Sequence, residues 1–147
     1  NHHKQEYTVQ AIVLATHLGV SVDDAESYID DQDYLVLTDE EADQEVYDYI
    51  KESVWTFNPS FLSAHTDYVK ESVFKLLQQE CEGANDAIMS MIKDFDYFVE
   101  DAVRCDGRGH FLAHYDSEEH EVTYLSIVRE NMCYKTEETT YYIYRRN

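Results

Sequence analysis

The sequence predicts an α+β fold in which an N-terminal bundle of about five helices is followed by a small antiparallel β-sheet. Apolar residues recur at helical spacing before Gly107, and alternating residues rich in tyrosine and threonine follow Gly109. The period therefore changes at these two glycines. Because 147 residues can bury a substantial core, we predict a single domain, residues 1–147, helical over about 5–105 and stranded over about 110–147.

Start and stop signals define the first two helices. Thr8 can cap a helix that extends to about residue 18, with Val9, Ile12, Val13 and Thr16 on one side and Gly19 as its stop. Ser21 can cap a second, short helix, with Asp24 as its capping-box partner.

A short apolar strand over residues 34–37 precedes the clearest helix start in the chain. Thr38 and Glu41 stand at capping-box spacing. The helix that follows is predicted to bury Ala42, Val46, Ile50 and Val54. Its acidic residues Glu41, Glu45, Asp48 and Glu52 follow at steps of four, three and four, which places them along one edge.

The middle of the chain predicts a turn fixed by Pro59 and two further helices. One is capped by Thr66 and extends to about residue 80. The other, the longest in the prediction, begins at Asn85 and is expected to bury the apolar residues Ile88, Met91, Ile92, Phe95, Phe98, Val99 and Ala102. Strands are predicted over residues 110–115, 121–128, 132–135 and 139–145, the last with Tyr142 and Tyr144 on one face.

Asp106, Gly107, Arg108 and Gly109 are predicted to form a structural corner between helix and strand. Glycine permits a positive φ or a close approach of backbone to another segment. Arg108 is expected to pair with a nearby carboxylate, with Asp116 as a candidate. A functional loop is the alternative for this stretch.

The segment DGRGHFLAHYDSEEHEV and the terminal YYIYRRN resemble a group of small acidic proteins of tailed bacteriophages. The stretches YLVLTDEEAD, VWTFNPSFLSAHT and CEGANDAI resemble the same group, so the resemblance covers about residues 34–147. Proteins of this group tend to have glycine after the Tyr-Asp pair, where this chain has Ser117. The resemblance implies a phage origin and the cytoplasm of a bacterial host, and it implies no particular chemistry.

The formal net charge is −20, whereas a magnitude of about 2–8 serves the solubility of a small domain. Residues 23–48 hold 12 Asp or Glu and no Lys or Arg. This field excludes nucleic acid and anionic membranes as good direct partners and favours a basic protein. The candidate partner-binding residues are Asp23, Asp24, Glu26, Asp30, Asp31, Asp33, Glu41, Glu45, Asp48 and Glu52.

A nucleic-acid mimic needs a charge density close to that of a duplex. One acidic helix edge supplies a charge about every 5.5 Å, and a DNA strand supplies one about every 3.4 Å. The second helix and the turn at residues 30–33 would therefore have to share one surface with the edge that begins at Glu41.

Motifs for catalysis and metal binding are sparse. No Walker loop, Rossmann fingerprint or Gly-x-Ser-x-Gly occurs, and Asp94 and Asp96 do not continue into an EF-hand. No apolar run is long enough to cross a membrane, and the three cysteines predict free thiols in a reducing compartment. We therefore expect no cofactor and no metal site. The residues that could still converge on a divalent ion are His65, His110, His114, His120, Asp116 and Glu118.

Three hypotheses about function remain open. The first, which we favour, is a phage-encoded inhibitor, not an enzyme, that mimics nucleic acid and blocks the basic groove of a host defence protein, such as a CRISPR effector or a restriction enzyme. The second is a structural or adaptor protein that oligomerises through its tyrosine-rich strands, a homodimer included. The third is a metal-dependent enzyme that uses the C-terminal histidines.

Overall fold

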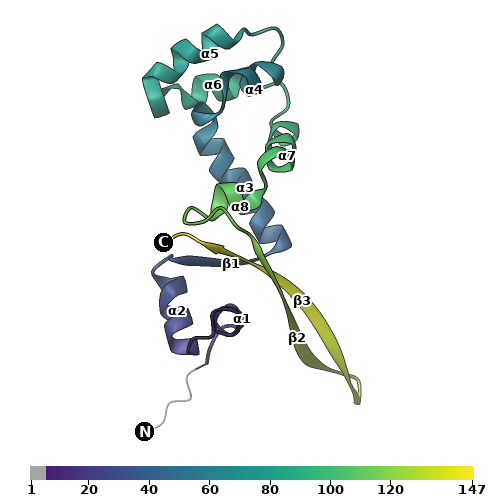
Figure 1. Ribbon diagram of the computed structural model, residues 1–147. Coiled ribbons are helices and arrows are strands. Elements are labelled where there is room, and N and C mark those ends of the chain that lie inside the picture. Colours follow the sequence, from purple (N-terminus) through teal and green to yellow (C-terminus); the bar gives the residue numbers. More distant parts are fainter. Residues whose placement is uncertain (1–5) are drawn as a thin grey trace. The chain divides into compact units, whose positions relative to one another are not determined.

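The computed structural model describes residues 6–147 (Figure 1). As predicted, the fold is mixed, with helices that mostly precede an antiparallel sheet. The chain divides into two compact units, one formed by the residues up to Gln44 together with Arg108–Asn147 and the other by Glu45–Gly107. The single-domain prediction stays a prediction, and residue 5, its expected helical start, lies outside the described residues.

The first unit contains three strands and a small set of helices. Its elements are α1 (Val9–Leu18), α2 (Val22–Asp30), β1 (Tyr34–Thr38), the start of α3 (Asp39–Ser53), α8 (Arg108–Leu112), β2 (His120–Glu130) and β3 (Cys133–Arg145).

Side-chain caps form at the predicted helix starts of this unit. Thr8 Oγ1 accepts a hydrogen bond from the backbone N–H of Ala11 at 3.1 Å, and Ser21 Oγ accepts one from Asp24 N at 3.1 Å. Gly19 ends α1 with φ +71°. The predicted buried face of α1 was partly wrong, because the helix buries Ala11, Val13, Leu14 and Ala15 and leaves Thr16 exposed.

The three strands pair in the order β1-β3-β2, and both pairings are antiparallel. Strand β1 covers only Tyr141–Arg145 of β3, so the rest of β3 pairs with β2 alone. Residues 132–135 and 139–145 were predicted as separate strands, but they belong to one strand apart from Met132. The core between α1, α2 and the sheet consists of Val13, Leu14, Ala15, Ala25, Val36, Tyr141 and Ile143.

The predicted strand over residues 110–115 was wrong, since the chain forms the short helix α8 there. Phe111, Leu112 and Ala113 are all buried. Three consecutive buried residues are incompatible with a strand that has one exposed face, because successive strand side chains point to opposite faces. The corner at Gly107 therefore leads from one helix into another helix.

The second unit is helical. After the remainder of α3 it contains the 3₁₀ turns η1 (Val54–Thr56) and η2 (Gln78–Ala84) and the helices α4 (Pro59–Ala64), α5 (Glu71–Leu77), α6 (Asn85–Met91) and α7 (Phe95–Asp106). Its fully buried side chains include those of Ile50, Val54, Leu62, Phe74, Ile88 and Phe98.

The helices of this unit are shorter and more numerous than predicted. Thr66 does not cap a helix. Its hydroxyl accepts from Val69 N at 3.3 Å, as a cap would, but no helix follows and α5 begins only at Glu71. The predicted long helix from Asn85 is two helices. Ile92 has an extended backbone, and Asp94 caps α7 by accepting from Tyr97 N at 3.1 Å.

Candidate functional site

The acids of α2 and the turn after it lie mostly on the solvent side of the first unit. Ala25 is buried against the core, whereas the four acids Asp23, Asp24, Asp30 and Asp31 are exposed. Within the described residues none of these four carboxylates has an ion-pair partner. Asp23 accepts a hydrogen bond from the Tyr7 hydroxyl at 2.8 Å, which raises the pKa of Tyr7.

Two residues predicted for this surface are half-buried. One carboxylate oxygen of Glu26, Oε2, is buried without a hydrogen-bond partner among the described residues. Asp33 binds the two residues that follow β3. Its carbonyl oxygen accepts from Arg146 N at 2.8 Å, and its carboxylate accepts from Asn147 Nδ2 at 2.7 Å. Asp33 and Glu26 therefore present less of their charge to a partner than the four exposed acids.

Helix α3 carries the second acidic set. Glu41, Glu45, Asp48 and Glu52 are exposed, while Ala42, Val46 and Ile50 are buried, as the periodicity predicts. Glu41 completes the predicted capping box, because its carboxylate accepts from Thr38 N at 3.0 Å and its N–H donates to Thr38 Oγ1 at 3.3 Å. Glu41 belongs to the first unit and the other three acids to the second.

Arg108 forms ion pairs with three other carboxylates of the first unit. Its side chain is only 11% exposed. Nη1 lies 2.8 Å from Asp39 Oδ1 and 2.9 Å from Asp43 Oδ1, and Nε lies 2.8 Å from Glu119 Oε1. The guanidinium also lies 4.5 Å from the ring centre of Tyr142. Arg108 thus pairs with carboxylates, as expected, but the candidate Asp116 is not among them.

These contacts keep Arg108 charged. Burial alone lowers its pKa, but the hydrogen bonds to Glu119 and Asp39 outweigh burial and raise the pKa. The buried Tyr144 hydroxyl donates to Glu119, and burial together with that hydrogen bond raises the pKa of Tyr144. The Arg108 side chain thus makes its ion pairs and its ring contact within the first unit.

The two glycines of the corner serve different needs. Gly107 follows Asp106, the last residue of α7, and has φ +83° and ψ 155°, a region that is essentially restricted to glycine. Gly109 has no positive φ. It is buried, and a Cβ at its position would lie 2.6 Å from Ser117 O and 2.9 Å from Glu119 N.

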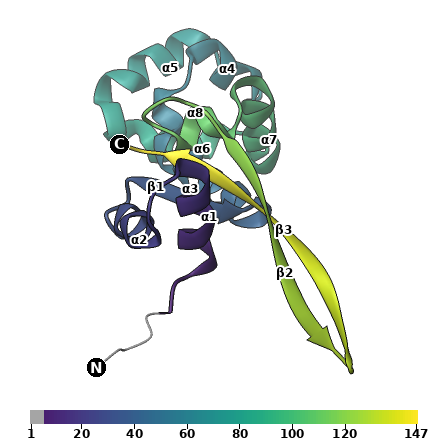
Figure 2. The ribbon, with the colours of Figure 1, turned by 60° about the horizontal axis from the view of Figure 1, so that its bottom comes forward.

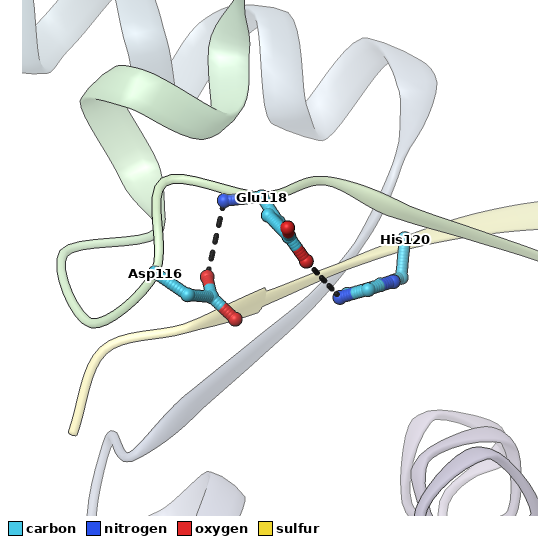
Figure 3. A group of neighbouring side chains, drawn as sticks. All are labelled: Asp116, Glu118 and His120. Atoms are coloured by element: carbon cyan, nitrogen blue, oxygen red, sulfur yellow. Dashed lines mark hydrogen bonds and ion pairs between the residues drawn. The ribbon is translucent and has the colours of Figure 1, made fainter.

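Three of the residues considered for a metal ion do converge. Ligand atoms of Asp116, Glu118 and His120 all lie within 4.8 Å of one another (Figure 3). The cluster has internal bonds, since Glu118 N donates to Asp116 Oδ1 at 3.0 Å and His120 Nε2 lies 3.5 Å from Glu118 Oε2. The centres of the His17 and His120 rings lie 5.0 Å apart. Burial lowers the pKa of His17, and the charge of a protonated His120 lowers it further.

The other three histidines are engaged elsewhere. His65 is buried and its Nε2 lies 2.7 Å from Asp101 Oδ2 in the second unit. His114 Nε2 lies 3.0 Å from Phe111 O, and the His110 ring packs edge-on against Phe111. Among the five of these residues that lie in the first unit, the described structure groups Asp116, Glu118 and His120, whereas His65 belongs to the second unit. The remaining trio offers two carboxylates and one imidazole, a ligand set that suits several divalent ions.

A feature that the sequence analysis missed is the exposed apolar surface of the β2–β3 hairpin. Leu125 and Ile127 are 59% and 77% exposed, and Met132 and Tyr134 are 92% and 74% exposed. By contrast, Tyr144 is buried and Tyr142 is half-buried, so the tyrosines singled out for an interface lie mainly inside the unit. The sequence did indicate this surface, because both faces of the predicted strand over residues 121–128 carry apolar side chains.

Within the described residues, no helix combines the length and apolar character that crossing a membrane requires. No family model matches the sequence, and comparisons with curated proteins and with solved structures find no match.

Proposed function

We propose that the protein is a phage-encoded inhibitor that binds a basic nucleic-acid-binding protein of the bacterial host, in the host cytoplasm, and occupies its groove. One observation carries this proposal. The acids Asp23, Asp24, Asp30, Asp31, Glu41, Glu45 and Glu52 are exposed and have no ion-pair partner within the described residues.

The distribution of the basic residues supports the proposal. Arg108 neutralises Asp39 and Asp43, which lie on α3 on either side of Glu41 in the sequence, yet it leaves Glu41 and Glu45 uncompensated. Like charges at i and i+4 of a helix destabilise it by a few tenths of a kcal/mol per pair. An acidic edge that costs stability is consistent with selection for binding.

A positive groove that holds nucleic acid is the surface most complementary to such an edge. Opposite potentials steer the two proteins together and raise the association rate, and salt reduces this effect. Occupation of the groove excludes nucleic acid directly. The host defence proteins that use such grooves include CRISPR effectors and restriction enzymes.

The test has two stages. Tagged protein is used to capture partners from a lysate of the bacterial host, and each captured protein is then purified. The proposal predicts a basic nucleic-acid-binding protein whose complex with DNA or RNA is displaced by the acidic chain in a competition assay. A captured protein that binds the chain and nucleic acid at the same time would contradict groove occupation.

An adaptor protein that acts through its β-sheet is the second candidate. The exposed side chains of Leu125, Ile127, Met132 and Tyr134 favour it, because apolar residues gathered on one projecting element mark interaction sites. A captured partner that is not basic, with binding insensitive to salt, would favour this candidate over the inhibitor.

A further inference from the structure

The outer edge of β2 is unpaired in the described sheet. The strand order β1-β3-β2 places β2 at one side of the sheet, with 11 residues and without proline or glycine. Figures 1 and 2 show β2 and β3 extending as a ribbon away from α1, α2 and β1. Exposed strand edges offer unpaired N–H and C=O groups to another strand, and natural proteins usually block them with charges, bulges or proline.

Strand β2 carries Glu121 near its start, and near its end it carries Arg129, of opposite sign, and Glu130, which pairs with Lys135 of β3. Glu121 and Arg129 are both exposed, and neither has an ion-pair partner among the described residues. Both residues lie on the same face as Leu125, because side chains alternate along a strand. Leu125 stands midway between them, four residues from each.

We propose that two copies of this chain associate by antiparallel pairing of their β2 edges about a two-fold axis at Leu125. This register places Leu125 opposite Leu125 of the second copy, and Glu121 opposite Arg129. On the other face it places Val122 opposite Val128. A two-fold interface uses the same patch twice, so the Glu121–Arg129 pair forms twice.

The proposed pairing also adds strands to the part of the β2–β3 hairpin that has only two. Beyond Thr140 towards its turn the ribbon has only two strands, and a two-stranded hairpin is marginally stable by itself. Pairing two ribbons gives a four-stranded sheet and brings the exposed Leu125 and Ile127 of both copies together.

The free edge of β3 is the rival surface, and it fits less well. Its unpaired part is Cys133–Thr140, and Lys135, the cation it offers, already pairs with Glu130 at 2.8 Å. The proposed dimer is independent of the proposed function, because the acids of α2 and α3 take no part in the contact between the two β2 strands.

Charge reversal in the 147-residue chain tests the register by sedimentation equilibrium. Glu121→Arg opposes Arg129 of the second copy with a like charge, and Arg129→Glu opposes Glu121 in the same way. Each variant should weaken the dimer by about tenfold or more, since two attractive pairs become repulsive. An equimolar mixture of the two variants should restore it, because each heterodimer then has opposite charges at both pairs.

The matched control is Glu40→Arg at the start of α3, which makes the same change in net charge after β1, the strand on the other side of β3 from β2. General repulsion between chains of charge −20 would make Glu121→Arg and Glu40→Arg associate more tightly than wild type. Of these two variants, the proposal expects a loss only for Glu121→Arg. A monomeric wild type, a mixture that fails to associate, or a loss from Glu40→Arg equal to that from Glu121→Arg would overturn it.

A disulfide reports the register directly. In a background with Cys81, Cys105 and Cys133 replaced by serine, Leu125→Cys should oxidise to a covalent dimer, because paired antiparallel residues have Cα atoms about 4.5–5.5 Å apart. Thr123→Cys is the control, since its two copies would lie about 14 Å apart along the strands. Equal cross-linking of both variants, or none at Leu125→Cys, would contradict the register.

Discussion

Arg108 Nε donates to Glu119 Oε1 over 2.8 Å, and the Tyr144 hydroxyl donates to the same carboxylate oxygen. This shared acceptor connects the start of α8 with the end of β3. Asp39 and Asp43 complete the surroundings of the guanidinium from α3. Arg108 therefore supplies the positive charge that neutralises Asp39, Asp43 and Glu119.

Replacing that cation should strongly destabilise the fold. Arg108→Met leaves Glu119 and the largely exposed Asp39 and Asp43 close together without a counter-charge, and we expect a loss of about 1.5–3 kcal/mol in the free energy of unfolding, measured with urea. Arg104→Met is the control, because Arg104 is 63% exposed and reaches Asp101 only at 4.0 Å. It should change stability by no more than about 0.5 kcal/mol.

Neutralising the three acids in the Arg108→Met background separates charge from packing. The added changes Asp39→Asn, Asp43→Asn and Glu119→Gln should recover part of the loss, since three carboxylates close together repel one another and three amides do not. A loss below about 1 kcal/mol for Arg108→Met would show that the cluster contributes little.

The two corner glycines should respond unequally to alanine. Gly107→Ala places a Cβ on a backbone with φ +83°, which costs about 1–3 kcal/mol. Gly109→Ala should cost more, because its Cβ would collide with the backbone of Ser117 and Glu119, which cannot rotate away. Thermal unfolding of both variants measures the difference, and equal melting temperatures would contradict this assignment of roles.

Ser117 has φ +60°, a left-handed backbone conformation that glycine adopts more readily than serine. Ser117→Gly should raise stability by up to about 1 kcal/mol, since it relieves the left-handed strain of a non-glycine residue. Ser126→Gly in the extended strand β2 should instead lower stability by about 0.5–1 kcal/mol, and a loss at both positions would refute the strain at Ser117.

Tyr144 should contribute to the loss of stability at alkaline pH. Burial, then the hydrogen bond to Glu119, raises its pKa in the folded state, while an unfolded tyrosine titrates near 10. The unfolded state therefore releases the proton first. The contribution is complete below about pH 10 and is lost as the pH rises above that value and through the folded pKa.

Urea midpoints from pH 8 to 11 test this sign. Tyr144→Phe should be less stable than wild type at pH 8 and should lose less stability as the pH rises. Tyr134→Phe, at an exposed position, should follow the wild-type curve. A curve for Tyr144→Phe that stays parallel to wild type would show that this hydroxyl does not titrate differently in the folded state.

Local signals predicted the parts of the fold that local interactions determine. The caps at Thr8 and Ser21 and the capping box at Thr38 form because each needs only neighbouring residues. The helix break at Ile92 was missed, because the apolar spacing continues through it and only the cap at Asp94 marks it. Periodicity reports which residues are buried, and two short helices can bury the same residues as one long helix.

Contacts between distant segments explain the other differences. Arg108 finds Asp39 and Asp43 about 65–69 positions away, and among so many acids no spacing rule could select them. Residues 108–112 form a helix that packs Gly109 closely against Ser117, a contact that the local composition does not reveal. For the acidic candidates, exposure followed from helical periodicity, whereas Asp33 and Glu26 are half-buried through tertiary contacts.

Neutralising the acidic sets should leave the fold intact. The α3 set, changed to Glu41→Gln, Glu45→Gln, Asp48→Asn and Glu52→Gln, removes repulsion along the helix, so the melting temperature should hold or rise slightly. Glutamine at Glu41 can still close the capping box. The α2 set, Asp23→Asn, Asp24→Asn, Asp30→Asn and Asp31→Asn, makes the same change in net charge. A matched control with equal charge change is Glu80→Gln, Glu82→Gln, Asp86→Asn and Glu100→Gln.

The affinity of these three variants for the captured basic partner, measured against salt concentration, tests the central claim most directly. The account predicts that both acidic sets weaken binding and flatten its salt dependence, because charges at the interface are lost. The control should bind like wild type apart from a small general effect. Undiminished affinity in both the α2 and α3 variants, or an equal loss in the control, would contradict an acidic binding surface on this protein.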